Sequence, residues 1–132
     1  LVYIDDYAHH PTEINAVHQA VRELYPTKKV LAIFQPHLFS RTKDFIDGFA
    51  ESLSQFDQVL LLDIYPAREL PMEGVASDWL LGKINNSNKK LIAKTDLTAE
   101  LKATDCTVIV TIGAGDIGEL TGLVKEALNE KI

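Results

Sequence analysis

Apolar residues recur along the chain in five short runs that are rich in valine, isoleucine and leucine. The runs are nearly continuous rather than alternating with polar residues, which is typical of strands that are buried on both faces of a sheet. We therefore predict five strands, at residues 1–4, 29–34, 58–64, 90–94 and 107–113.

The segments between these runs carry apolar residues at the three- to four-residue period of an amphipathic helix. Pro11 suits the first turn of the first helix, and Ser40 and Ser77 suit the N-caps of the second and third. Asp116 is favourable at the positive end of the last helix. We predict helices at residues 11–25, 41–56, 77–84, 96–103 and 116–130.

The alternation of strands and helices predicts an α/β fold. Parallel neighbours require crossover connections, so we expect a three-layer α/β/α, Rossmann-like domain with a mainly parallel sheet. A length of 132 residues fits a single domain that spans residues 1–132. The longest irregular segment, residues 64–77, contains two prolines and a glycine. Loops of this length in compact domains are often functional.

Composition narrows the possible partners. Thirteen basic and nineteen acidic side chains give a net charge of −6 without a basic cluster, which argues against nucleic acid. Cys106 is the only cysteine, so no internal disulfide is possible and a cytoplasmic location is the default. No apolar stretch approaches the roughly 20 residues of a membrane span. The chain begins without methionine and enters a strand at once, so we expect a piece of a longer protein.

The unusual polar residues follow the predicted strands. Ligands of open parallel sheets bind at the carboxyl ends of the strands, so residues placed there are candidates for a site. We expect four motifs to converge on one edge of the sheet: DDYAHHP at 5–11, QPHLFSR at 35–41, YPARE at 65–69 and GAGD at 113–116.

Most of these residues also have a structural interpretation. Asp5 and Asp6 can stabilise the start of the following helix, and His9 and His10 can cap it. The glycines of GAGD can serve a tight turn, because the dinucleotide-binding pattern belongs after the first strand of a domain rather than the last. His18, inside a helix pattern, reads as an ordinary surface or partly buried residue.

Metal and anion binding are the functional alternatives for the same residues. A metal cluster of His9, His10, Glu13 and His37 is not favoured, because structural zinc ligands are spaced more tightly. Arg41 is the hardest residue to explain structurally. The helix dipole opposes a cation at a helix start, so a bound anion is a natural reason for its presence.

A receiver-like phosphoacceptor signalling domain is an alternative that uses the same geometry. Receiver domains carry an acidic pair after the first strand and a phosphorylated aspartate after the third, and Asp5, Asp6 and Asp63 fit that plan. The plan also requires a lysine after the fifth strand, whereas TIGAGD contains none.

Four motifs in this order and spacing carry a family resemblance: DDYAHHPTEI, FQPHLFSRTKDF, LDIYPARE and TIGAGDIG. Over essentially its whole length the chain resembles the C-terminal domain of the Mur ligases. The double histidine and FQPH…SRT are similar to the alanine-adding members. The resemblance implies an ATP-dependent ligase of peptidoglycan biosynthesis, the pathway that builds the cell wall. It would join L-alanine to UDP-N-acetylmuramate through an acyl-phosphate intermediate.

The resemblance also implies a three-domain enzyme of which this chain is the amino-acid-binding part. The UDP-sugar domain and the ATP-binding central domain would be absent from this fragment, and the sequence contains no G-x-x-x-x-G-K-[ST] phosphate loop. ATP and Mg²⁺ would be held mainly by the missing central domain. We therefore expect the isolated fragment to be inactive.

Individual roles follow from the motifs by resemblance. Asp6 would hydrogen-bond the ATP ribose and Tyr7 would lie beside the nucleotide and the alanine. His9 would be catalytic, close to the phosphates or the developing intermediate. Gly113 and Gly115 would let the backbone pass close to the reacting centre.

The amino acid would be bound by Tyr7, His37 and Arg41, with Arg41 pairing the carboxylate. Many members of the family carry a second arginine where this chain has Leu38, so Arg68 is a candidate replacement. The family fold further implies that the first strand lies beside the last, and the last beside the second. The family also has an antiparallel strand just before the first strand, which this fragment would lack, so the first strand would be an exposed edge.

Overall fold

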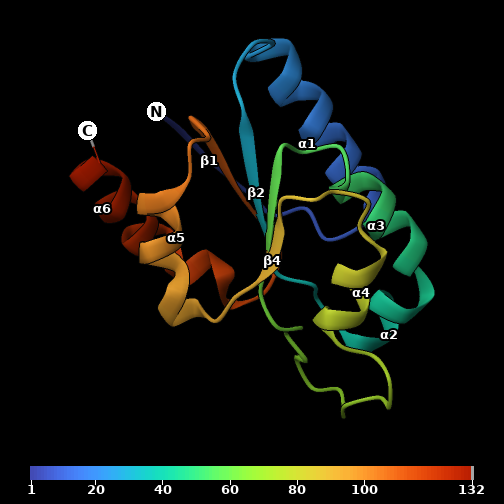
Figure 1. Cartoon of the computed structure of the whole chain (residues 1–132). Helices are drawn as coiled ribbons and strands as arrows, with labels where there is room; N and C mark the ends of the chain where they lie inside the picture. The colour runs from blue at the N-terminus through green and yellow to red at the C-terminus, as the bar shows by residue number, and fades with distance from the viewer. Residues whose placement is uncertain (132) are drawn as a thin grey trace.

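The computed structural model describes residues 1–131 and contains one five-stranded sheet in the order β1-β5-β2-β3-β4 (Figure 1). Every neighbouring pair in the sheet is parallel. This confirms the predicted α/β class and the predicted adjacency of the first, last and second strands. The strands are β1 (Val2–Asp6), β2 (Val30–Phe34), β3 (Gln58–Leu61), β4 (Lys89–Leu91) and β5 (Val108–Ile112).

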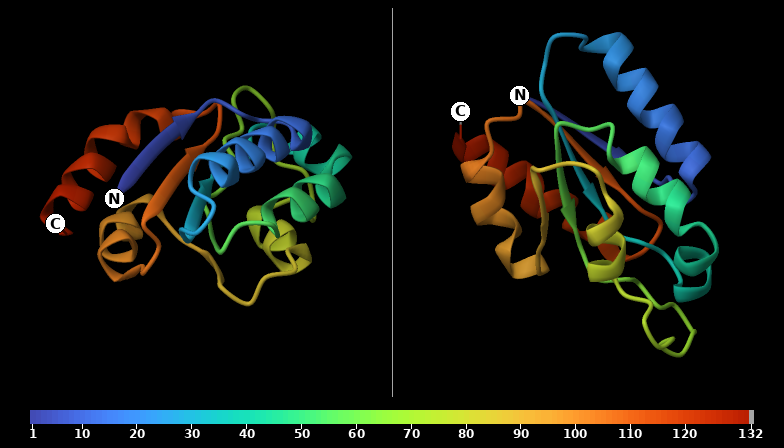
Figure 2. Two further views of the ribbon diagram at one scale, coloured as in Figure 1. Left: turned by 90° about the horizontal axis from the view of Figure 1, so that it is seen from above. Right: turned by 45° about the vertical axis from the view of Figure 1, so that its right-hand side comes forward.

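Helices cover both faces of the sheet and give the three predicted layers (Figure 2). One face is covered by α1 (Pro11–Leu24), α3 (Ile46–Leu53) and α4 (Ser77–Lys83). The other is covered by α5 (Leu97–Ala103), the 3₁₀ helix η2 (Asp116–Leu120) and α6 (Thr121–Lys131). The remaining elements are the short α2 (Phe39–Asp44) and the 3₁₀ turn η1 (Lys94–Asp96).

The central strand β2 explains why the apolar runs are continuous. Val30, Ala32 and Phe34 pack into the core beneath α1, α3 and α4. Leu31 and Ile33 point into the opposite core beneath α5 and α6. All five residues are fully buried, because side chains alternate across a strand and both faces of this one are covered.

Two predicted strands are longer than the observed ones. β3 ends at Leu61 and β4 at Leu91, although the apolar patterns continue beyond both. Leu62 and Ile92 remain buried after leaving the ladder, so hydrophobicity there reflects burial rather than strand pairing. β1, by contrast, extends through two aspartates to Asp6. These acids pair with the end of β5, where the Thr111 hydroxyl donates to Asp5 Oδ1 at 2.7 Å.

The predicted helix at 41–56 is instead two helices, α2 and α3, which meet at Phe45. Ser40 is not an N-cap: α2 begins at Phe39, two residues before the predicted start, and its N-cap residue Leu38 makes no side-chain cap. Ser77 is also inside its helix, α4, and its hydroxyl donates to the Leu62 carbonyl at 2.6 Å. Serine can bond a distant carbonyl as readily as a local amide, so these cap predictions were wrong.

The last two predicted helices are confirmed with modified starts. The helix expected at 96–103 is preceded by η1, and the one expected at 116–130 begins as η2 before becoming α6. Within residues 1–131, none of the helices has both the length and the apolar character needed to cross a membrane.

Candidate functional site

The carboxyl ends of β1, β5 and β2 lie side by side, and the segments that leave them are tied together by backbone hydrogen bonds. Gly113 N–H donates to the Asp6 carbonyl at 3.1 Å, and Gln35 N–H donates to the Ile112 carbonyl at 3.1 Å. The strand order thus brings three of the four sequence motifs side by side at one edge of the sheet, and Tyr65 of the fourth lies beside His37 at the same edge.

Four aromatic rings form a row along this edge. The Tyr7 and His9 rings are 6.1 Å apart, His9 and His37 are 6.3 Å apart, and His37 and Tyr65 are 5.6 Å apart between centroids. The row joins the β1–α1 loop, the β2–α2 loop and the segment after β3. Tyr7 is 71% exposed, so its ring is open to a ligand, whereas His37 is partly buried.

His37 has the most perturbed environment in the row. Burial lowers its pKa, and the nearby Arg41 and His9 lower it further, while the Ala114 backbone and Glu69 partly oppose the shift. The ring is therefore neutral near pH 7. Its Nδ1 atom is buried and has no hydrogen-bond partner among residues 1–131. Such an unsatisfied polar atom is uncommon and calls for an explanation.

Arg41 lies in the first turn of α2, close enough to His37 and Glu69 to affect their pKa values. It is partly buried and makes no ion pair with any of the residues that the structure describes. A guanidinium carries five donors suited to a carboxylate or a phosphate. The position remains the one where an anionic ligand group fits best.

The β1–α1 loop uses several of its polar groups internally. Asp6 Oδ1 accepts from Ala8 N–H at 2.9 Å, and His10 Nδ1 accepts from Thr12 N–H at 3.3 Å as the N-cap of α1. His9 N–H donates to Glu13 Oε1 at 3.2 Å. The structural interpretation of His10 as a cap is confirmed. Asp6 and His9 keep further polar atoms available at the edge.

The two predicted site glycines are needed for packing. Gly113 has a φ of +153°, which disfavours other residues, and an added Cβ would lie 2.9 Å from the Ile117 side chain. At Gly115 an added Cβ would lie 2.6 Å from both Gln35 Oε1 and the Tyr65 ring. The atoms crowding both positions belong to the protein itself, as the tight-turn interpretation predicts.

A second cluster, which sequence reasoning missed, lies beside the aromatic row. Gln35 donates to Asp116 Oδ1 at 2.6 Å and accepts from Ile117 N–H at 3.0 Å, and Lys94 pairs with the other Asp116 oxygen. Burial raises the pKa of Asp116, but the bonds from Lys94 and Gln35 outweigh it and the pKa lies below its usual value. Gln35, Lys94, Asp116 and Tyr65 line a pocket of about 360 Å³.

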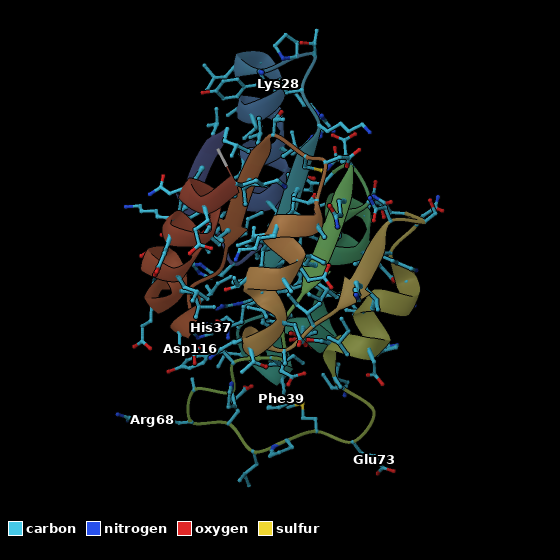
Figure 3. The ribbon with its side chains drawn as sticks, turned by 60° about the vertical axis from the view of Figure 1, so that its left-hand side comes forward. Lys28, His37, Phe39, Arg68, Glu73 and Asp116 are labelled. Atoms are coloured by element: carbon cyan, nitrogen blue, oxygen red, sulfur yellow. The ribbon has the colours of Figure 1, made fainter. Side chains whose placement is uncertain are left out.

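Part of this cluster was detectable. Gln35, like His37, is a polar residue just after a fully buried strand, and that position is visible in the sequence. No sequence pattern predicts the pairing of Lys94 with Asp116. Figure 3 shows His37 and Asp116 above the loop that follows β3.

One predicted site residue, Arg68, does not join the edge, and His18 stays apart from it as predicted. Arg68 is exposed and projects from the loop away from His37 (Figure 3). His18 lies in α1, where its Nε2 accepts from Arg22 at 3.0 Å and its ring meets Phe56, as expected for an ordinary helix residue. Within residues 1–131, no three His, Cys, Asp or Glu side chains gather as a metal site. The disfavoured cluster of His9, His10, Glu13 and His37 does not form.

The receiver-like alternative is wrong. Receiver domains place their first strand beside the third, whereas β5 and β2 separate β1 from β3 here. Three strand spacings put Asp63 about 14 Å from the end of β1. Asp5 is also engaged with Thr111, which in turn contacts the Tyr3 hydroxyl at 2.8 Å. The three acids do not converge.

A family model described as "Mur ligase, glutamate ligase domain" matches residues 1–115. The chain belongs to the Mur ligase family. The family resemblance of the sequence motifs is therefore confirmed, and the residues at the carboxyl edge are those of a Mur ligase domain.

Two relatives of this Mur ligase domain are both named UDP-N-acetylmuramate–L-alanine ligase. The protein of Flavobacterium johnsoniae is 75% identical over 132 residues, which are 100% of this chain and 29% of that protein. The protein of Cytophaga hutchinsonii is 54% identical over 125 residues, which are 95% of this chain and 27% of that protein. The chain thus spans less than a third of the length of these relatives.

Solved structures show the same fold. A UDP-N-acetylmuramate-alanine ligase from Thermotoga maritima superposes with a TM-score of 0.73 at 24% identity, covering 98% of this chain and 27% of that one. A murein peptide ligase from Psychrobacter arcticus gives a TM-score of 0.73 at 20% identity, covering 98% and 28%. At these identities the likeness supports the architecture of the Mur ligase domain.

Proposed function

We propose that this chain is the C-terminal, amino-acid-binding domain of an ATP-dependent ligase that joins L-alanine to UDP-N-acetylmuramate. The full protein would act in the cytoplasm, where ATP is available, in peptidoglycan biosynthesis. The observation that carries the proposal is Arg41, which forms no ion pair within residues 1–131 and lies close to the partly buried His37 at the carboxyl edge of the sheet. The 75% identity to a ligase of that name supports the same assignment.

The groups at the edge match the chemistry of a small amino acid. Its carboxylate would be paired by Arg41, since a guanidinium can donate two parallel hydrogen bonds to it. A neutral imidazole can accept a hydrogen bond from the amine through its unprotonated nitrogen, and the His37 ring is partly exposed at this edge. In this proposal His9 lies 6.3 Å from His37, ring to ring, and faces the reacting carboxyl group.

ATP and Mg²⁺, when bound, would activate the muramic acid carboxylate as an acyl phosphate. The residues present fit only the outer part of ATP: Tyr7 offers an exposed ring and Asp6 a carboxylate for the ribose. The phosphates and Mg²⁺ would be held mainly by the central domain, and UDP-N-acetylmuramate by the remaining domain. Both lie outside this chain in the proposal.

The test is amide formation by the full-length protein. With UDP-N-acetylmuramate, ATP and radiolabelled L-alanine, we expect a labelled product whose amount equals the ADP released. Omitting any one substrate should abolish it, and the isolated 132-residue chain should give none. ATP hydrolysis without labelled product would refute the assignment.

A further inference from the structure

The first turn of α2, which carries Arg41, is held from outside by the loop that follows β3. Leu38, the N-cap residue, has no side-chain cap. The missing acceptor is supplied by Glu69, whose Oε1 accepts from Ser40 N–H at 3.1 Å. Its other oxygen, Oε2, accepts from the Ser40 hydroxyl. A carboxylate at this end of a helix also interacts favourably with the helix dipole.

Backbone hydrogen bonds join the same two segments. Leu38 N–H donates to the Tyr65 carbonyl at 2.9 Å, and Tyr65 N–H donates to the Pro36 carbonyl at 2.8 Å. Glu69 is held in turn, because its N–H donates to the Pro66 carbonyl at 2.9 Å. The loop and the start of α2 therefore form one connected unit.

Strained backbone marks the same place. Among residues 1–131, the only non-glycine residues with positive φ are Leu38, at 73°, and Ala67, at 54°. One lies on each side of the junction. Left-handed conformations are unfavourable for such residues and persist where surrounding contacts over-determine them. The hydrogen bonds around Glu69 are those contacts.

Glu69 does not neutralise Arg41. The two side chains form no ion pair within 4 Å, and the hydrogen bonds from Ser40 are what chiefly lower the pKa of Glu69, with Arg41 a minor cause. The Glu69 carboxylate therefore binds Ser40, the residue next to Arg41. The Arg41 guanidinium forms no ion pair within residues 1–131 and can bind a ligand in this proposal.

We propose that Glu69 is a positioning residue that fixes the first turn of α2, and with it Arg41, in the orientation that binds the amino-acid carboxylate. The inference rests on the proposed function, since it needs Arg41 to contact alanine. Glu69 itself would touch no substrate. Its effect should pass through Arg41 alone.

A double-mutant cycle in the full-length ligase tests this. Glu69→Ala should raise the apparent KM for alanine roughly threefold to tenfold, a modest part of what misplacing a binding group by an ångström can cost. The KM for ATP should stay within about twofold, because the hydrogen bonds of Glu69 go to Ser40 and not to Asp6 or Tyr7, the residues proposed for the nucleotide. In an Arg41→Ala background, Glu69→Ala should have no further effect on the alanine KM.

Ser40→Ala tests the same contact from the α2 side, because it removes one of the two hydrogen bonds between Ser40 and Glu69. Glu69→Gln keeps one acceptor oxygen, so both variants should give smaller increases than Glu69→Ala. Unchanged thermal unfolding would exclude a general loss of structure.

Two results would overturn the inference: an unchanged alanine KM in Glu69→Ala, or an equal increase with and without Arg41. If Arg41→Ala itself leaves the alanine KM unchanged, the inference fails together with the assigned role of Arg41. Amide formation by the wild-type enzyme still reports separately on the ligase assignment.

Discussion

Two neighbouring regions at the carboxyl edge of the sheet differ in how fully their polar groups are satisfied. Around Asp116, Gln35 and Lys94 complete a network in which each charged or amide group has a partner inside the protein. Around His37, the buried Nδ1 atom and the Arg41 guanidinium have none among residues 1–131. Both regions are polar and adjacent, so polarity alone does not mark a site. In our proposal, the lack of internal partners around His37 and Arg41 is what marks the site.

Replacing Arg41 should have the largest effect of the changes proposed here, and the effect should be on alanine binding rather than on stability. Arg41→Lys in the full-length ligase should raise the alanine KM about tenfold or more, because lysine keeps the charge but cannot form the bidentate pair. The measurement is the alanine dependence of amide formation at saturating ATP. Leu38→Arg in the Arg41→Lys background should restore part of the affinity. An unchanged alanine KM in Arg41→Lys would show that the carboxylate is held elsewhere and would refute the assigned role of Arg41.

Adding a methyl group beside the hydrogen-bonded network of Gln35, Lys94 and Asp116 should instead lower the stability of the fold. Gly115→Ala places a Cβ 2.6 Å from Gln35 Oε1 and from Tyr65, so we expect a loss of about 1–3 kcal/mol in the free energy of unfolding. Urea titration measures it. Gly118→Ala is the matched control: nothing lies within 4 Å of its added Cβ, so stability should stay constant or rise slightly. Equal losses in both variants would contradict the packing around Gly115.

The pH dependence of stability should report on the same network. The pKa of Asp116 is lower in the folded state than its unfolded-state value of 3.8. Its contribution to the free energy of unfolding is therefore present above pH 3.8 and is lost as the pH falls through the lower folded-state pKa. The stability difference between wild type and Asp116→Asn should therefore be constant from about pH 7 to 5 and shrink toward about pH 3. A difference that persists at the acid end would mean that the charge of Asp116 contributes nothing.

The smallest effect concerns the strained loop. Ala67 has a φ of 54°, so Ala67→Gly should stabilise the protein by up to about 1 kcal/mol by removing the left-handed penalty. Gly74→Ala in the same loop is the reverse change: its φ is +76° and its surroundings are open, so only backbone strain should destabilise it. Thermal unfolding of both variants gives the comparison. Shifts of the same sign would contradict it.

The five strands and most helices were predictable because burial on both faces leaves a strong apolar signal, as in β2. The family resemblance added the strand order, which composition cannot give. Predictions failed where a polar side chain had a choice of partners. Ser40 and Ser77 look like helix caps in sequence, yet they bond Glu69 and the Leu62 carbonyl.

The candidate site was predictable in its residues rather than in its connections. His9, His37 and Arg41 stand at strand ends or helix starts, where ligands of parallel sheets bind, and this position made them candidates. Glu69 and Lys94 act across long sequence separations, through Ser40 and Asp116 respectively. No local pattern encodes such pairs, because they depend on how two loops pack in three dimensions.

The most direct test of ligand binding around His37 and Arg41 is the NMR signal of the His37 ring in the full-length enzyme. The enzyme is isotope-labelled at histidine, and the signal is assigned by comparison with His37→Gln. With UDP-N-acetylmuramate and a non-hydrolysable ATP analogue present, adding L-alanine should shift the His37 resonances. The His18 ring, engaged by Arg22 in α1, should not move and serves as the control. If saturating alanine leaves the His37 signal unchanged in an enzyme that forms the amide, the amino acid does not bind at this edge and the account is wrong.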